Sequence, residues 1–154
     1  MDMIRLFGNK VFLRVTVSVF FSLFCLSSFG KCEDKIREFY VEYMQNAGRN
    51  PELNEALCEA HITSELRVQL GNYIAATDVD PVLRAQDVCD YGIESLSVTD
   101  LSDDWYMVRY KWDSNSEYIE IPLKASEYDG TMKISYITPL WLGNRYGDIL
   151  LRKE

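Results

Sequence analysis

The residues closest to a catalytic pair are a cysteine and a histidine near the end of one predicted helix. Cys58 and His61 stand three positions apart, so their side chains share one helix face. A thiolate beside an imidazole base is the arrangement of a covalent nucleophile. This chemistry also needs an orienting group and an oxyanion site, and no signature in the sequence supports either. His61 is the only histidine, so we interpret it as a helix-end residue and expect no catalytic site and no enzyme.

Acidic residues gather between positions 78 and 90. Carboxylates are the hard oxygen ligands that Ca²⁺ prefers, but their spacing is not that of an EF-hand, and the glycine of such a loop is missing. The alternative is structural: an aspartate before Pro81 accepts hydrogen bonds in a turn, and Gln86 ties the loop to the sheet. We favour the structural alternative and expect no metal. The candidate acidic loop consists of Asp78, Asp80, Gln86 and Asp87.

Aromatic side chains are the third candidate for a site. Tyrosine and tryptophan combine an apolar body with a polar tip, which suits the recognition of a peptide or small molecule. The same residues at regular spacing also form hydrophobic cores, and both interpretations stay open. No P-loop, Rossmann fingerprint or G-x-S-x-G motif occurs, so we expect no cofactor. The candidate ligand-binding residues are Tyr40, Tyr43, Tyr106, Tyr110, Trp112 and Tyr136.

Residues 1–30 have the pattern of an export signal. Basic residues precede an apolar run over 11–29, and small residues around Ser28 and Gly30 offer a cleavage site. A retained membrane anchor and a lipidated cysteine are the alternatives, but Arg14 interrupts the run, and neither nearby cysteine follows a suitable lipidation motif. We therefore expect residues 31–154 to form a single domain, exported to the periplasm or the exterior of a bacterium.

Three cysteines remain after residue 30. One pair can close in an oxidising compartment. Cys58 and Cys89 each stand beside a predicted helix, and we favour a disulfide between them, with Cys32 as a free thiol. Three reduced, half-buried thiols are the alternative.

The composition narrows the range of partners. Residues 31–154 keep 13 of the 16 basic and 23 of the 24 acidic residues, which gives a net charge of −10. This charge argues against nucleic acid and against an anionic membrane surface once the signal is removed. It is compatible with a solvated acidic surface or with a basic partner.

Helices are predicted in the first half of this domain. Residues 33–46 place apolar side chains at the helical period, and Gly48 follows as a stop. Asn50 and Pro51 begin a second helix, with Leu53, Ala56, Leu57 and Ala60 on its inner face. Thr63 or Ser64 caps a third helix, whose apolar positions are Leu66, Leu70, Tyr73 and Ile74. Residues 78–90 are polar and aperiodic, and we expect an ordered connection.

Four strands are predicted in the second half, where apolar residues alternate with polar ones. Their ranges are 93–99, 105–112, 117–125 and 131–138. Pro122 lacks an amide donor, which predicts an edge position or a bulge. Asp129-Gly130 is a hairpin turn. Met132, Ile134 and Tyr136 are expected to share one face of the last strand.

Helices followed by a run of antiparallel strands indicate an α+β fold, with the helices packed on a curved sheet of about four strands. Within that pattern, Asp78-Val79-Asp80-Pro81 and Gln86-Asp87, together with Phe39-Tyr40 and Tyr43, resemble the small exported bacterial proteins of domain of unknown function 3828. That group is similar to the nuclear-transport-factor-2-like and cystatin-like folds, which implies a cone-like roll. The likeness covers about residues 33–139, although Thr131-Met132-Lys133 stands where such families often place a tryptophan. The resemblance implies no chemistry.

The function predicted from these features is an exported, non-enzymatic binding or protein-interaction domain. Its partner is an unknown protein, peptide or small molecule. The alternatives are a small cell-envelope inhibitor or immunity-like protein, and an enzyme with a pocket inside the cone.

Overall fold

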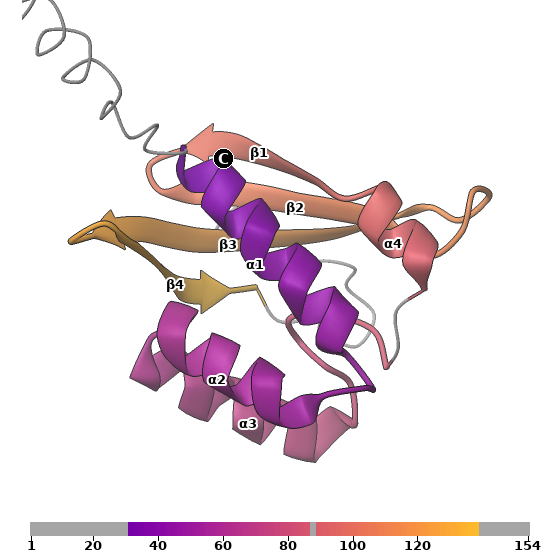
Figure 1. Cartoon of the computed structure of the whole chain (residues 1–154), viewed down its shortest axis with the longest axis horizontal. Helices are drawn as coiled ribbons and strands as arrows, with labels where there is room; N and C mark the ends of the chain where they lie inside the picture. The colour runs from indigo at the N-terminus through magenta and orange to yellow at the C-terminus, as the bar shows by residue number, and fades with distance from the viewer. Residues whose placement is uncertain (1–30, 87–88, 139–154) are drawn as a thin grey trace, which may run out of the picture.

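The computed structural model describes residues 31–86 and 89–138. Helices pack on one face of a four-stranded antiparallel sheet with the order β1-β2-β3-β4 (Figure 1). The predicted α+β fold is therefore confirmed. The elements are α1 (Cys32–Asn46), α2 (Pro51–His61), α3 (Ser64–Thr77), α4 (Asp90–Glu94), β1 (Ser97–Ser102), β2 (Trp105–Lys111), β3 (Tyr118–Tyr128) and β4 (Thr131–Ile137).

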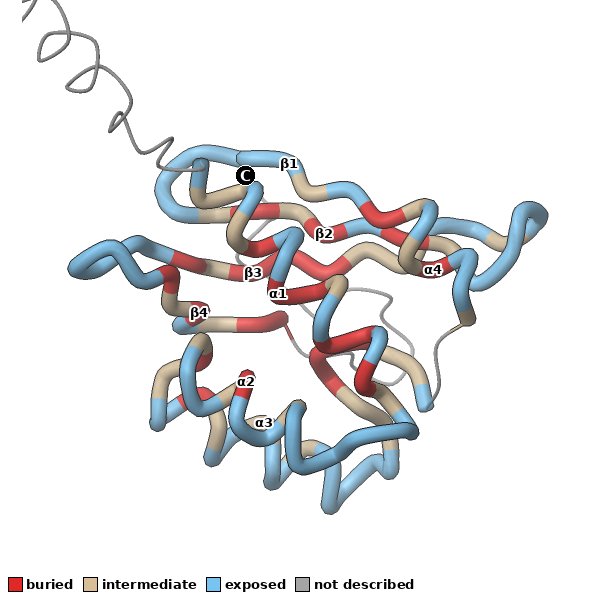
Figure 2. The backbone as a smooth tube through the Cα atoms, viewed as in Figure 1, coloured by how far each residue is buried: buried red, intermediate tan, exposed pale blue. Residues whose placement is uncertain are grey.

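Helix α1 lies across the sheet and supplies one wall of the core (Figure 1). Its apolar residues recur at three- and four-residue intervals, so they form one stripe. Figure 2 shows this stripe buried, while the opposite side of the helix is exposed. The buried apolar residues are Ile36, Phe39, Tyr40, Tyr43 and Met44. The predicted first helix is confirmed.

Helices α2 and α3 are confirmed at nearly the predicted positions, but they bury less than expected. Leu57 is the buried residue of α2, whereas Leu53 is 55% exposed. Leu66 is the buried residue of α3, and Ile74 is 44% exposed. The predicted inner stripes are therefore too wide, because, of the other helices and strands, α2 meets only α1, α3 and β4, and α3 meets only α2 and β4. The Thr63 side chain caps α3 by accepting from the Leu66 amide.

The sheet is a meander in which each strand pairs with the next one. Asp129 and Gly130 form the tight turn between β3 and β4, both with positive φ, as the sequence predicted. The first strand begins later than predicted, because residues 90–94 form α4 instead.

A register shift in β4 overturns one prediction. The pairing passes from Lys124–Tyr136 to Ala125–Ile134, so β4 has one extra residue. A β-bulge of this kind reverses the alternation of the side chains that follow it. Ile137 and Ile134 are therefore both buried, and Tyr136 faces the other side of the sheet. The prediction that Tyr136 shares a face with Ile134 is wrong.

Pro122 is not at an edge, because it pairs with Met107 in the internal strand β3. Its carbonyl accepts the Thr138 amide, 3.0 Å away. The amide and carbonyl of one strand residue point to the same side. The missing donor of Pro122 therefore faces Thr138, just past β4, and the Thr138 carbonyl accepts from Arg84 Nη2 instead. The extra residue of β4 lies opposite Lys124 and Ala125, two residues further along β3.

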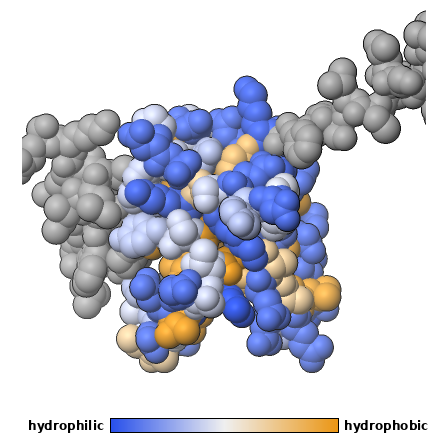
Figure 3. Space-filling model, turned by 90° about the vertical axis from the view of Figure 1, so that its left-hand side faces the viewer, coloured by the Kyte–Doolittle hydropathy of each residue, from blue (hydrophilic) through white to orange (hydrophobic). Residues whose placement is uncertain are grey.

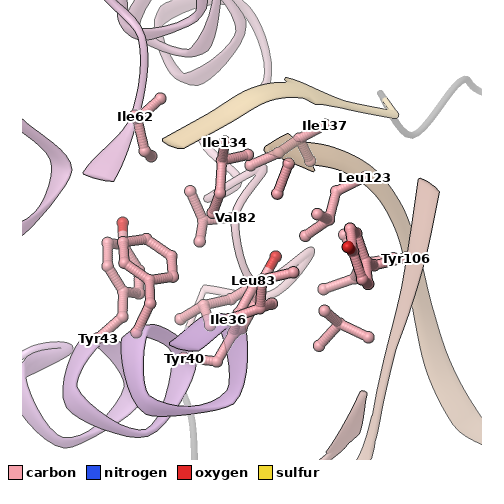
Figure 4. Close-up of a cluster of buried hydrophobic side chains, with 14 of the residues drawn as sticks. Ile36, Tyr40, Tyr43, Ile62, Val82, Leu83, Tyr106, Leu123, Ile134 and Ile137 are labelled. Carbon is pink, nitrogen blue, oxygen red and sulfur yellow. The ribbon is translucent and has the colours of Figure 1, made fainter. Parts of the chain in front are cut away.

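The segment before residue 87 closes the core instead of forming a polar surface connection. Pro81, Val82 and Leu83 are buried between α1 and the sheet. Figure 4 shows Val82 and Leu83 among side chains from α1 and from the strands. We call residues 78–86 the core loop. Its apolar triplet was the signal for this role, and the neighbouring aspartates concealed it.

Some predictions fall on residues outside the described ranges. They are the export signal in residues 1–30, Asp87, and the extension of the domain over residues 139–154. Among the residues that the structure describes, no helix has the length and apolarity to cross a membrane.

Candidate functional site

The predicted aromatic residues do not line one pocket. Tyr40 and Tyr110 are fully buried, and Tyr106 is 8% exposed, because all three side chains belong to the hydrophobic core. Figure 4 shows Tyr40 and Tyr106 between α1 and the sheet. The Tyr110 hydroxyl donates to the Leu83 carbonyl of the core loop. These three tyrosines belong to the core.

Two of the predicted aromatic residues lie away from this core. Trp112 follows the end of β2 and is 41% exposed. Tyr136 lies on the sheet face that carries Trp105, and the two rings meet edge to face with their centroids 5.8 Å apart. The Lys124 ammonium lies 5.0 Å from the centre of the Trp105 ring, a cation–π distance. Trp112 and Tyr136 therefore share no site with the interior tyrosines.

Tyr43 is the aromatic residue that meets the acidic loop. Its hydroxyl donates to Asp80 Oδ2 at 2.8 Å, and the Val82 amide donates to Asp80 Oδ1 at 2.8 Å. Burial raises the pKa of the Asp80 carboxyl above its ordinary value, although both donors lower it. Burial, followed by the charge of Asp80, also raises the pKa of the Tyr43 hydroxyl. The pair joins the last turns of α1 to the core loop.

A hollow of about 310 Å³ opens beside this pair at the C-terminal end of α1, and we call it the α1-end hollow. Its walls come from the end of α1, the first two turns of α2 and the core loop. The structure thus brings together residues from three separate candidate groups of the sequence analysis: Tyr43, Cys58, and the pair Asp80 and Gln86. The lining residues used below are Tyr43, Asn54, Glu55, Cys58, Asp80 and Gln86.

The other residues of the predicted acidic loop have structural positions. Asp78 caps the end of α3 in a left-handed conformation, with φ of 56°. The Gln86 side chain donates to the Asp78 carbonyl at 3.3 Å and closes the loop on itself, whereas it was expected to tie the loop to the sheet. Among the described residues, no group of three or more His, Cys, Asp or Glu side chains is arranged to hold a metal.

The cysteine–histidine pair is not assembled. His61 Nδ1 donates to the Met132 carbonyl at 3.2 Å, and its ring packs on Phe39. The Cys58 thiol instead borders the α1-end hollow. Burial, followed by the charge of Asp80, raises the pKa of this thiol to about 11. The thiol is therefore protonated at neutral pH, which makes it a poor nucleophile.

The predicted Cys58–Cys89 disulfide is absent, because Cys32, Cys58 and Cys89 are all free thiols in the structure. Cys89 lies on the other side of the α1 end, in a larger hollow of about 790 Å³ beside α4. Its thiol donates to the Trp112 carbonyl. The candidate site is the smaller hollow, because Tyr43, Cys58, Asp80 and Gln86 all line it.

Arg84 is the important residue that the sequence analysis missed. Its Nη1 donates to the Glu120 carbonyl at 2.8 Å, and its Nη2 donates to the Thr138 carbonyl at 2.6 Å and to the Thr138 hydroxyl. One side chain thus ties the core loop to β3 and to the end of β4. A single base next to the triplet Pro81-Val82-Leu83 was the available signal, because a charge beside buried residues needs partners.

The end of the molecule opposite the α1-end hollow carries the β1–β2 and β3–β4 turns. Figure 3 shows that hydrophilic residues dominate this face and that its hydrophobic areas are small and scattered. Among the described residues visible in this view, no broad apolar surface is presented to a partner.

Comparison with known proteins gives two solved structures of the same fold. No family model matches the sequence, and no curated protein matches it, so the resemblance to domain of unknown function 3828 stays a prediction. One chain of the type VI native effector–immunity complex Tae3–Tai3 from Ralstonia pickettii has a TM-score of 0.50 at 20% identity, covering 68% of this chain and 91% of that chain. This likeness shows the fold alone.

The other structure is a protein of unknown function from Bacteroides thetaiotaomicron. It superposes with a TM-score of 0.65, and the match covers 70% of this chain and 88% of that chain. Identity over the match is 32%. The chain therefore belongs to the same family as this Bacteroides thetaiotaomicron protein.

Proposed function

We propose that this chain is an exported, non-enzymatic protein-interaction domain that recognises its partner through the surface around the α1-end hollow. One observation carries the proposal. Core side chains fill the space between α1 and the sheet, so recognition falls to the surface. The polar residues predicted for a site, Tyr43, Asp80 and Gln86, meet at that hollow.

The chemistry of the hollow supports binding over catalysis. The Asp80 carboxylate already accepts from Tyr43 and from the Val82 amide, which gives it a structural role. The Cys58 thiol has a raised pKa of about 11, and the histidine is bound to β4. A nucleophile with an adjacent base, the minimum for covalent catalysis, is therefore not assembled from these residues.

A narrower form of the proposal is an immunity-like or inhibitor protein of the cell envelope. The Ralstonia pickettii complex supports the use of this fold in a protein complex. The net charge of −8 of the whole chain favours a basic partner, because opposite charges speed and orient association.

Site-directed photocrosslinking in the native host tests the proposal. A benzophenone amino acid replaces the exposed Arg49, which directly follows Gly48 in the wall of the α1-end hollow, and in a second strain it replaces Tyr128 at the far hairpin, which is 81% exposed. We expect one discrete protein adduct from position 49 and none from position 128. Equal adducts from both positions, or no adduct from position 49, contradict recognition at this surface.

A further inference from the structure

We propose that the α1-end hollow holds a positively charged side chain, an arginine or lysine that the partner protein inserts. The inference rests on the proposed function and specifies its chemistry. It draws on the charges that line the hollow, the helix end that opens into it, the positions of the nearby bases, and the size of the space.

The charged side chains that line the hollow are acidic. Glu55 on α2 and Asp80 on the core loop both border it, and no lysine or arginine is among its lining residues. A carboxylate in a partly buried setting is stabilised most by a cation that also donates hydrogen bonds. The hollow is therefore complementary to a basic group.

The backbone adds negative potential at the same place. The last turn of α1 opens into the hollow, and the C-terminal end of a helix carries a partial negative charge. Many helices offset this charge with a lysine or arginine in the last turn, but α1 has none. A basic side chain from a partner would occupy that position.

Three bases of the chain lie on or next to the elements that form the hollow, but none of them lines it. The Arg84 guanidinium donates to Glu120 and Thr138 on the sheet side of the core loop. Arg49 follows α1 but lines the larger hollow beside α4. Arg67 on α3 is close enough to lower the pKa of Cys58, yet it is not among the lining residues. Within the described part of the chain, these bases leave the hollow open to a cation from outside.

The size and the hydrogen-bonding groups fit one long side chain. The volume of about 310 Å³ is at the lower end of the roughly 300–1,000 Å³ of ligand pockets. Asn54 Nδ2 donates to the Tyr43 carbonyl at 3.0 Å, which holds this side chain in the wall of the hollow. A guanidinium or ammonium supplies several donors to the Glu55 and Asp80 carboxylates in the same wall.

The burial of Asp80 is compatible with a cation site. Burial raises the pKa of its carboxyl, which means that the charged form is poorly compensated. A bound guanidinium or ammonium would lower that pKa again.

Three capped peptides test the inference by NMR titration of the ¹⁵N-labelled protein. They are acetyl-Gly-Arg-Gly-amide, the lysine equivalent, and the citrulline equivalent, which is nearly isosteric with arginine but neutral. The side-chain amide signals of Asn54 and Gln86 report on the hollow. We expect the arginine or the lysine peptide to bind at least about tenfold more tightly than the citrulline peptide, because charge-assisted hydrogen bonds are roughly twice as strong as neutral ones.

Matched variants of one helix give the control. Glu55→Gln removes an exposed lining charge and should weaken the basic peptide about threefold, whereas Glu59→Gln, one turn further along α2, should leave its affinity unchanged. Asp80→Asn should weaken it about tenfold, with the NMR spectrum showing whether the variant is folded. Equal binding of the charged and neutral peptides, no binding of either, or equal effects of E55Q and E59Q would each overturn the inference.

The outcome is separable from that of the proposed function. An adduct at position 49 without basic-peptide selectivity refutes the cation site and keeps protein recognition. Selective binding of the basic peptide without any adduct supports a cation site and refutes the protein-interaction proposal.

Discussion

The two sides of the core loop make opposite use of polar groups. On the inner side, Arg84 is bound to the backbone of the sheet, and Leu83 accepts from Tyr110. On the outer side, the Asp80 side chain lines the α1-end hollow. Burial raises the pKa of its carboxyl above the ordinary value. A single short loop thus both closes the core and presents a charge. The comparison predicts that the inner contacts contribute more to stability than the outer ones.

The largest loss of stability should come from removing a buried ring on the inner side of the core loop. Tyr110→Ala removes a fully buried ring and its hydrogen bond to Leu83, and we expect the free energy of unfolding to fall by about 4 kcal/mol. Trp112→Ala, two positions along the chain, should cost less than about 1 kcal/mol because that ring is 41% exposed. Urea unfolding measures both variants. Similar losses would contradict the filled interior.

The second-largest loss of stability should come from removing the Arg84 hydrogen bonds that join the core loop to the sheet. Arg84→Met keeps much of the side-chain length but leaves the Glu120 and Thr138 carbonyls without this donor, and we expect a loss of about 3 kcal/mol. The matched control is Arg109→Met on β2, which removes the ion pair of an arginine side chain that is 46% exposed and should cost at most about 1 kcal/mol. Thermal unfolding compares them, and equal changes in Tm would refute the tie.

Two neighbouring tyrosines of α1 should respond in opposite directions. Tyr43→Phe removes a donor from Asp80 and should destabilise the protein by about 1.5 kcal/mol. The Tyr40 hydroxyl is buried and makes no hydrogen bond with the described residues, so Tyr40→Phe should be neutral or stabilise by about 0.5 kcal/mol. Urea unfolding of both variants measures the two changes in the free energy of unfolding. A clear loss in Tyr40→Phe would reveal a partner for that hydroxyl.

The smallest effect concerns pH. The folded-state pKa of Asp80 is raised, so its stabilising contribution is complete below the ordinary value of 3.8 and is lost as the pH rises through the raised value. Asparagine does not titrate. The wild type should therefore lose stability relative to Asp80→Asn across that window, as urea unfolding between about pH 3 and pH 7 would measure. A difference that is constant or opposite in sign would show that burial does not control this carboxyl.

Much of the fold is readable from local patterns. The period of α1, Asn50 and Pro51 at the start of α2, and the Asp129-Gly130 turn each specify an element with little help from the rest of the chain. Tyr136 shows the limit of this reasoning. The bulge that reverses its face depends on how β4 pairs with β3, which no alternation within one strand reveals.

The candidate site was only partly readable. Tyr43 and Asp80 were each identified as candidates, but they are 37 positions apart and meet only because the core loop folds back under α1. Asn54 and Glu55 had no signal at all, since a residue on the exposed side of a helix resembles any other solvent-facing residue. Tyrosines at regular spacing could not be assigned to the core or to a pocket before the loop that fills the interior was known.

The bridge between Ile62 and Ile134 has a consequence for solubility. Ile62 pairs with β4 in parallel, and the Thr63 amide donates to the Ile134 carbonyl at 3.0 Å, so the α2–α3 junction covers the free edge of β4. The other edge of the described sheet is β1, which is short, carries Asp100 and is distorted by a bulge. Uncovered, regular edge strands are the sites at which sheets of separate molecules join. Loosening this junction would open a second edge and favour aggregation before the domain unfolds.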